Sequence, residues 1–302
     1  MNARILKANI LLLVTAAIWG SGFVAQRSGM DYVGPMTFNA VRFAIGALSL
    51  LPLLIWHDRK GIPAVSPGVK PNFIFLGALA AGTALFCAVS LQQIGMIHTP
   101  AAKAGFITGL YVVIVPFLGL ALGQRPGVGG FIGTAAAAVG LYLVSVTKDF
   151  TIAPGDTYVI IGAVLWAGHM QVLGWLSPKL DGVRLAFGQF AVCSVLCTAS
   201  ALAFEDVTLA GIAAGWIPIV YGGIMPVGVA FTLQIIAQKD APPTHAAIIL
   251  SLEAVFAAFG GWLILGETLT TRAMFGCALM LAGMLAAQLW PERQPATAAA
   301  RS

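Results

Sequence analysis

The stretch LGQRPGVGGFIGTAAAAVGLYLV, residues 122–144, decides the fold of this chain. A short polar link, Gln124-Arg125-Pro126, is followed by an uncharged run from Val128 to Val146, which is long enough to cross the hydrocarbon core of a bilayer as one helix. Its glycines would weaken a soluble helix, but membrane helices tolerate them because neighbouring groups satisfy the backbone. The stretch therefore predicts a membrane-spanning helix that is entered through a very short loop.

The rest of the chain has the same composition. Of its 302 residues, 59% are hydrophobic and 9% are charged, and the mean hydropathy is +0.92, whereas soluble domains are about 45–50% apolar. The predicted spans are Ala8–Gln26, Pro35–Trp56, Asn72–Ile94, Pro100–Leu122, Val128–Val146, Thr157–Leu176, Val183–Phe204, Ala214–Ala237, Thr244–Leu265 and Arg272–Trp290. We therefore predict an all-α integral membrane protein with ten transmembrane helices.

The basic residues predict the orientation of these helices. With the N-terminus in the cytoplasm, 11 Lys and Arg residues fall on the inner side and 3 on the outer side, and cytoplasmic loops carry the excess of positive charge. The inner set is Arg4, Lys7, Arg59, Lys60, Lys70, Arg125, Lys179, Arg184, Lys239, Arg293 and Arg301, and the outer set is Arg27, Lys148 and Arg272. Both termini are therefore predicted to be cytoplasmic.

An internal repeat relates the two halves of the chain. The matched residues are Pro100 and Pro243, Gly133 and Gly276, and Gly140 and Gly283 at a shift of 143 residues, and Trp19 and Trp166 at a shift of 147. Each half, residues 1–148 and residues 149–302, holds five predicted helices in the same order. Because five is odd, the second half enters the membrane from the opposite side, as in the inverted repeats of secondary transporters.

Several motifs resemble a known family. The two halves end in LALGQRPGVGGFIGTAAAAVGLYLV (residues 120–144) and WLILGETLTTRAMFGCALMLAGMLA (residues 262–286), the first helix contains AAIWGSGF (residues 16–23), and the second contains Pro35 and Arg42. With the two five-helix halves, these motifs resemble the EamA-type members of the drug/metabolite transporter superfamily over nearly the whole chain. The resemblance implies a ten-helix exporter of small organic metabolites, and amino-acid exporters, including exporters of aromatic amino acids, are prominent among its bacterial members.

The chain departs from the family pattern at two positions. Gln124 stands where the first half usually has a glutamate, whereas Glu267 keeps that residue in the second half. The family's Glu-Pro pair in the ninth helix is Glu253-Ala254 here, so that a helix break at this position has lost its proline. Both changes weaken an expectation of gating there, and neither affects the predicted fold.

Few charges fall inside the predicted spans, where each costs about 2.5 to 3.5 kcal/mol unless it has water, a partner or a function. Arg42 lies in the second span, Asn39 and Phe43 share its face of the helix, and Gln189 is its counterpart in the second half. Arg42 is a candidate to bind a substrate carboxylate through its permanently charged, planar guanidinium group. The alternative is that it pairs with a helix end or a carbonyl and fixes the packing.

Glu253, near the middle of the ninth span, is the candidate acid of the site. We expect it to accept a substrate ammonium or a coupling proton, and the alternative is a structural hydrogen bond to a kinked helix. Lys103, near the outer end of the fourth span, is a candidate gating residue that reaches into a cavity. Snorkelling of its side chain to the interface is the preferred interpretation.

Trp19 and Trp166 occupy matching positions in the middle of the first and sixth spans, and His169 lies one turn beyond Trp166 on the same face. We expect the two indoles to meet near the midplane, His169 to form a polar wall or a gate, and Gly20-Ser21-Gly22 to let neighbouring helices approach or water enter. The alternatives are a packed Trp19 bonded to a carbonyl and a neutral, hydrogen-bonded His169.

Glycines and prolines predict close packing and hinges. The spacings Gly105-x-x-x-Gly109 and Gly129-x-x-x-Gly133 favour helix packing within the chain over dimerisation. Pro116, Pro218 and Pro226 interrupt the fourth and eighth spans and are candidate hinges, although static kinks would leave the same pattern.

These observations predict a secondary transporter and not an enzyme. It would export small metabolites, above all amino acids including aromatic ones, by alternating access around a midplane cavity. The predicted cavity residues are Trp19, Asn39, Arg42, Phe43, Trp166, His169, Gln189 and Glu253, with Lys103, Glu253 and His169 as gating or coupling candidates. Efflux of drugs or other metabolites by the same fold is the alternative. An intramembrane enzyme is less favoured, because the four histidines are scattered through different segments.

No cofactor, metal ion or nucleic acid is expected to bind. The predicted partners are a small-molecule substrate and the lipid bilayer, with a monomer sufficient for transport. The short loops favour a multi-pass protein of a bacterial inner membrane.

Overall fold

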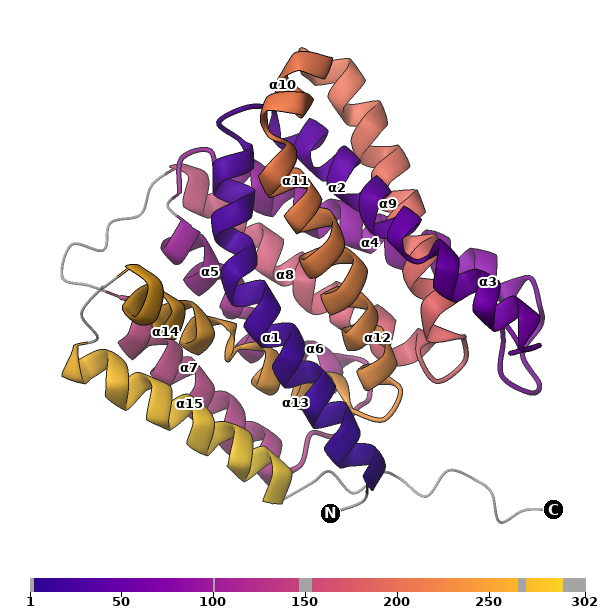
Figure 1. Cartoon of the computed structure of the whole chain (residues 1–302). Coiled ribbons are helices and arrows are strands. Elements are labelled where there is room, and N and C mark those ends of the chain that lie inside the picture. The colour runs from indigo at the N-terminus through magenta and orange to yellow at the C-terminus, as the bar shows by residue number, and fades with distance from the viewer. Residues whose placement is uncertain (1–2, 100, 147–153, 266–269, 290–302) are drawn as a thin grey trace.

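The computed structural model describes residues 3–99, 101–146, 154–265 and 270–289 (Figure 1). Their regular elements are helices, apart from an isolated β-bridge between Val65 and Leu180. The helices are α1 (Ala3–Gly29), α2 (Pro35–Ser49), α3 (Leu51–Arg59), α4 (Phe73–Gly95), α5 (Ala101–Gly109), α6 (Tyr111–Ala121), α7 (Val128–Ser145), α8 (Pro154–Leu176), α9 (Gly182–Phe204), α10 (Leu209–Ala214), α11 (Trp216–Gly222), η1 (Gly223–Phe231), α12 (Thr232–Gln238), α13 (Pro243–Leu250), α14 (Glu253–Leu265) and α15 (Thr271–Leu289). The predicted positions Lys148, Glu267, Arg293 and Arg301 lie outside the described residues.

The helices follow the predicted spans. Within the described residues, seven segments are long and apolar enough to cross a membrane: Ala3–Gly29, Pro35–Arg59, Phe73–Gly95, Lys103–Ala121, Pro154–Leu176, Gly182–Phe204 and Trp216–Gln238. Three shorter apolar helices, Val128–Val144, Pro243–Phe259 and Thr271–Ala287, coincide with the remaining predicted runs. Large apolar side chains such as Phe75 (70% exposed) and Leu202 (71% exposed) point outward, as expected for a surface that faces lipid. The predicted class of all-α integral membrane protein is confirmed.

Two of the apolar runs are interrupted near their middle. The fourth run breaks at Leu110, between α5 and α6, and the ninth breaks at Ser251 and Leu252, between α13 and α14. The second break is present although Ala254 stands where the family has a proline. The Ser251 hydroxyl donates to the Ile248 carbonyl at 2.8 Å, and such a bond from a serine side chain bends a helix.

The prolines lie elsewhere in the interrupted spans. Pro226 is inside η1, a π-helical segment in the middle of the eighth span, while Pro116 and Pro218 are accommodated within α6 and α11. Of the three candidate hinges, Pro226 therefore coincides with a change of helix type. The break of the fourth span falls at Leu110 and not at Pro116.

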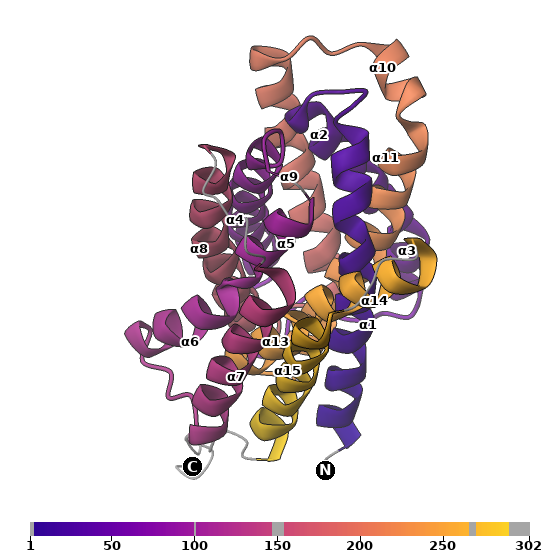
Figure 2. The ribbon, with the colours of Figure 1, turned by 90° about the vertical axis from the view of Figure 1, so that its left-hand side faces the viewer.

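Helices α7 and α15 pack backbone to backbone at one edge of the bundle (Figure 2). A methyl group at Gly133 would lie 2.7 Å from the Gly283 carbonyl oxygen, and one at Gly140 would lie 2.6 Å from the Gly276 carbonyl oxygen. Gly133 therefore faces Gly283, the repeat counterpart of Gly140, and Gly140 faces Gly276, the repeat counterpart of Gly133. The predicted packing of Gly133 within the chain is confirmed.

Helix α1 runs the length of the bundle, from the end where the chain begins to the opposite end, which carries α10 (Figures 1 and 2). Its middle approaches two other helices closely. A methyl group at Gly20 would lie 2.8 Å from the Glu253 carbonyl oxygen, and one at Gly22 would lie 3.2 Å from the Pro226 ring. The close approach predicted for Gly20-Ser21-Gly22 is confirmed, and it places Trp19 beside the interrupted span.

Candidate functional site

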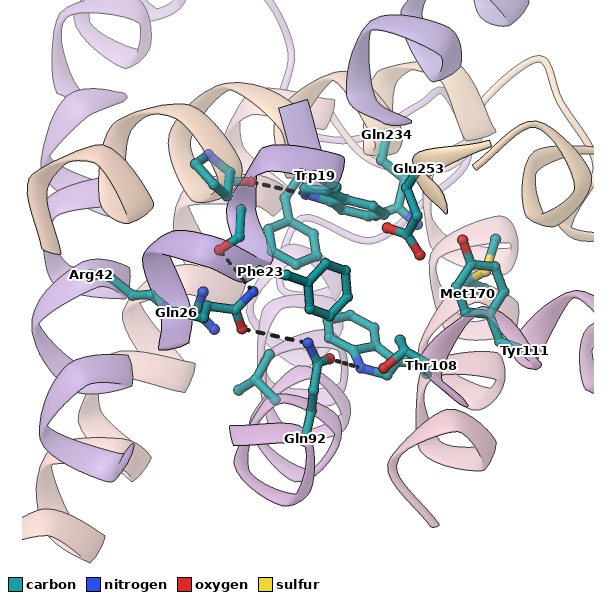
Figure 3. Close-up of a pocket in the computed structure, with 15 residues that line it drawn as sticks. Trp19, Phe23, Gln26, Arg42, Gln92, Thr108, Tyr111, Met170, Gln234 and Glu253 are labelled. Atoms are coloured by element: carbon teal, nitrogen blue, oxygen red, sulfur yellow. Dashed lines mark hydrogen bonds between the residues drawn. The ribbon is translucent and has the colours of Figure 1, made fainter. Parts of the chain in front are cut away.

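A pocket lies among the central helices, at the level of the helix interruptions (Figure 3). Its volume is about 550 Å³, part of which is open to solvent. The lining residues are Trp19, Gly22, Phe23, Gln26, Arg42, Val89, Gln92, Thr108, Tyr111, Trp166, Met170, Pro226, Phe231, Gln234 and Glu253. The pocket thus has room for a few small groups in this conformation.

Two indoles and one phenyl ring form the aromatic wall of the pocket. Phe231 lies between Trp19, whose ring centroid is 4.8 Å away in an edge-on arrangement, and Trp166, which stacks on Phe231 at 5.8 Å. The Trp19 indole donates to the Pro226 carbonyl at 3.3 Å, and the Trp166 indole donates to Gln92 Oε1 at 2.6 Å. The two indoles are therefore joined through Phe231, and the Trp19 N–H bonds a carbonyl as the alternative predicted, while its ring also lines the pocket.

Arg42 enters the pocket from α2 (Figure 3). Its side chain is held by a hydrogen bond from Nε to Asn39 Oδ1 at 3.0 Å, and its guanidinium carbon lies 5.3 Å and 5.1 Å from the ring centroids of Phe38 and Phe43. Arg42 is 3% exposed and has no carboxylate within 4.0 Å among the described residues. The pocket therefore contains a fixed positive charge that can attract an anionic group.

The start of α2 is fixed by a carboxylate from another helix. Glu205, at the end of α9, accepts hydrogen bonds from the backbone N–H groups of Met36 at 2.7 Å and Thr37 at 2.8 Å. A carboxylate is favourable at a helix N-terminus, where unpaired N–H groups carry partial positive charge. This contact sets the position of α2 and therefore of Arg42, two turns further along.

Glu253 is the first residue of α14, directly after the break at Ser251 and Leu252. Its side chain lines the pocket opposite Arg42 and faces Tyr111 (Figure 3). Glu253 is 4% exposed, and its Oε1 atom has no hydrogen-bond partner in the described chain. The helix break thus places a buried acid at the opposite end of the pocket from the buried arginine.

The other predicted cavity residues lie behind the wall of the pocket. Asn39 and Phe43 contact the Arg42 side chain, and Gln189 Oε1 lies 3.1 Å from His169 Nε2. The His169 ring packs edge-on against Trp166 at 5.7 Å. The pocket thus brings together four predicted residues at its surface, while Asn39, Phe43, His169 and Gln189 support them from behind.

Lys103 does not line the pocket. It forms an ion pair with Asp156 of α8, which is 1% exposed and also accepts a hydrogen bond from Thr99 Oγ1 at 2.8 Å. Gln124, which replaces the family's glutamate, donates to Gln171 Oε1 at 2.7 Å. Both polar groups therefore connect the first half of the chain to α8.

Five polar lining residues were absent from the sequence predictions. They are Gln26, Gln92, Thr108, Tyr111 and Gln234, and all are uncharged. Gln92 joins two of the walls, because it donates to Gln26 Oε1 at 3.5 Å and accepts from Trp166. A search for every uncharged polar residue inside an apolar run, rather than for charges alone, would have found them.

No group of three or more His, Cys, Asp or Glu residues arranged to hold a metal ion occurs among the described residues. The chemistry of the pocket is that of recognition: a cation, an acid, amide and hydroxyl groups, and aromatic surfaces. A pocket of this kind inside a multi-span helical bundle is suited to binding a small molecule within a membrane protein.

Comparisons with known proteins give the family. The profile of the EamA-like transporter family matches the chain twice, over residues 6–146 and 153–287. The chain belongs to this family. An uncharacterized transporter of Archaeoglobus fulgidus is 30% identical over 289 residues, covering 94% of this chain and 86% of the relative. The uncharacterized inner membrane transporter YedA of Escherichia coli K12 is 23% identical, covering 84% and 81%.

A solved crystal structure has the same fold, with a TM-score of 0.75 over 93% of this chain and 96% of its own, at 19% identity. The family and the names of these relatives indicate a transporter rather than an enzyme. The predicted membership of the EamA family is confirmed.

Proposed function

We propose that this transporter exports amino acids, including aromatic ones, by alternating access around the central pocket. The observation that carries the proposal is the placement of Arg42 and Glu253 at opposite ends of one pocket, with Trp19 and Trp166 in its wall (Figure 3). A zwitterion offers a carboxylate to the guanidinium and an ammonium to the acid. The aromatic wall offers apolar surface to its side chain.

The burial of both charges supports recognition of a zwitterion. Each is nearly excluded from solvent, and a buried charge that meets no opposite charge is costly. A bound amino acid supplies both missing partners at once. A neutral or singly charged molecule supplies at most one.

The interrupted helices support an alternating-access mechanism. Tyr111 and Glu253, which line the pocket, are the first residues after the breaks in the fourth and ninth spans. Discontinuous helices at the binding site are typical of secondary transporters built from inverted repeats. In this mechanism the first half of the predicted repeat, residues 1–148, moves against the second half, residues 149–302. The movement exposes the pocket first to one side of the membrane and then to the other. The proposed location is a bacterial inner membrane.

The direct test follows efflux of labelled amino acids from liposomes that contain the purified protein. We expect efflux above that of empty liposomes, and at least about a tenfold loss in Arg42→Gln and Glu253→Gln, because each variant removes the charge that meets one end of the substrate. Arg27→Gln and Asp31→Asn are matched controls, because these two residues form an exposed ion pair outside the pocket.

Two results would overturn the proposal. If no amino acid leaves the liposomes faster than from empty ones, the substrate class is wrong. If lipophilic cations leave and amino acids do not, the protein is a drug exporter of the same fold.

A further inference from the structure

Four oxygen atoms without a hydrogen-bond partner in the described chain belong to side chains that line the same pocket. They are Thr108 Oγ1, Tyr111 Oη, Gln234 Oε1 and Glu253 Oε1, and among them the Tyr111 hydroxyl and the Glu253 carboxyl group approach each other without the geometry of a full hydrogen bond. All four residues are more than nine-tenths buried. Buried polar atoms in native structures are nearly always paired, and apart from the approach of Tyr111 to Glu253 these oxygens have no partner in the described chain, which indicates a place built for a ligand.

The four residues come from four different helices that meet around the two interruptions. Thr108 in α5 and Tyr111 in α6 stand on either side of Leu110, and Glu253 follows the break at Ser251 and Leu252. Gln234 approaches from α12 on the same side of the pocket as Glu253 (Figure 3). The arrangement therefore depends on both helix breaks.

The chemistry of these atoms selects the kind of ligand. The carboxylate and amide oxygens only accept hydrogen bonds, and the two hydroxyl groups can accept as well as donate. A ligand that satisfies them must bring several N–H or O–H donors and, beside Glu253, a positive charge. An anionic group is unfavourable here and finds its partner at Arg42 instead.

We propose that Thr108, Tyr111, Gln234 and Glu253 form the subsite for the primary ammonium group of the substrate. A primary ammonium carries three N–H donors and one positive charge, which matches a carboxylate surrounded by three further oxygens. N-methylation removes donors and adds bulk, and N-acetylation removes the charge. The transporter therefore discriminates against N-substituted amino acids, an inference that rests on the proposed transport of amino acids.

The test compares efflux of three labelled compounds from liposomes that contain the whole protein. These are L-phenylalanine, N,N,N-trimethyl-L-phenylalanine and N-acetyl-L-phenylalanine, with the L-leucine series in parallel. We expect each parent amino acid to leave at least about tenfold faster than either derivative, because a site built to bond N–H groups rejects analogues that lack them.

Conservative variants locate the discrimination within the pocket. Thr108→Val, Tyr111→Phe and Gln234→Leu are each expected to slow efflux of the parent severalfold and to leave efflux of the trimethyl compound unchanged. Thr134→Val and Tyr142→Phe remove the same groups from α7, outside the pocket, and serve as controls. The Thr134 hydroxyl is itself buried and unpaired in the described chain, which makes this control a close match for Thr108→Val.

The outcomes separate this inference from the proposed function. If no amino acid moves at all, both fail. If parent amino acids move but their trimethyl derivatives move equally well, the ammonium subsite is wrong while amino-acid transport stands. The subsite is also wrong if the pocket variants behave like the α7 controls, or if efflux requires sodium ions without distinguishing the derivatives, because the oxygens then hold a metal cation.

Discussion

Contacts near the starts of α5 and α13, at the two ends of the bundle, use different chemistry. Lys103, the third residue of α5, forms an ion pair with Asp156 of α8. His245, the third residue of α13, lies with Nε2 at 2.8 Å from Oδ1 of Asn9 in α1. The repeat that superposes Trp19 on Trp166 also superposes Asn9 on Asp156. The shift of 143 places Lys103 on Ala246, the residue after His245, so the two contacts lie at neighbouring positions of the repeat and differ in charge.

The difference predicts that removing one partner is costlier at the charged contact than at the neutral one. Separating a buried ion pair leaves charges without partners, whereas separating a neutral pair loses a single hydrogen bond. The glycine contacts between α7 and α15 do not differ in this way, because equivalent glycines make the same contacts in both halves. Substitutions can therefore measure where the two halves are alike and where they differ.

The largest effect is expected at the charged end. Asp156→Ala leaves the Lys103 ammonium, which is 17% exposed, without its carboxylate and should lower the free energy of unfolding by about 3–5 kcal/mol. Thermal unfolding in detergent can be followed with a maleimide dye that reacts with Cys193 and Cys197, both buried in the native fold. Asp31→Asn, in an exposed ion pair, should cost about 0–1 kcal/mol, and an equal loss in both variants would contradict the comparison.

An intermediate and equal effect is expected for the glycines. In Gly140→Ala and Gly276→Ala the added methyl group lies 2.6 Å from a carbonyl oxygen of the facing helix. Overpacking costs about 1–3 kcal/mol, and the higher helix propensity of alanine offsets about 1 kcal/mol of that cost, so each variant should lose about 0–2 kcal/mol in the same unfolding assay. A difference between them larger than about 1 kcal/mol would show that this contact is not shared equally by the halves.

The smallest effect is expected at the neutral end. Asn9→Ala removes the partner of His245 and should cost about 0.5–1.5 kcal/mol, the value of an ordinary hydrogen bond. Asn72→Ala is the control, because the Asn72 side chain makes no capping bond to α4. If Asn9→Ala destabilised the protein as much as Asp156→Ala, the two ends would be equally strong and the comparison would be wrong.

The sequence was sufficient for the fold because length and apolar character determine which segments cross a membrane. The predicted spans match the helices closely, and the α7–α15 contact follows from glycines whose spacing is visible in the chain. The break before Glu253 was not predictable from a proline. Ser251 bonds the Ile248 carbonyl at the break, but Ser21 makes the same kind of bond inside the uninterrupted helix α1, so the residue type does not reveal the break.

The site was predictable where it uses rare residues. Arg42, Glu253 and the two tryptophans stand out in an apolar chain, and all four line the pocket. Asn39 and Gln189 stand out equally, but they bond to other side chains behind the wall. Gln26, Gln92 and Gln234 reach the pocket from helix faces that only the packing of the bundle determines.

The π-helical segment η1 determines the direction in which the side chains that follow it in the eighth span point. An α-helix advances about 100° per residue at 3.6 residues per turn, whereas a π-helix fits more residues into each turn. Phe231 at the end of η1 and Gln234 in α12 face the pocket in this arrangement. Restoring an α-helix over Gly223–Phe231 without deleting a residue would turn both side chains away by about 100° for each residue that the wider turns absorb, whereas deleting one residue at the same time would largely restore their direction. The wide segment therefore acts as an inserted residue that aligns one helix with a binding site without any change in its loops.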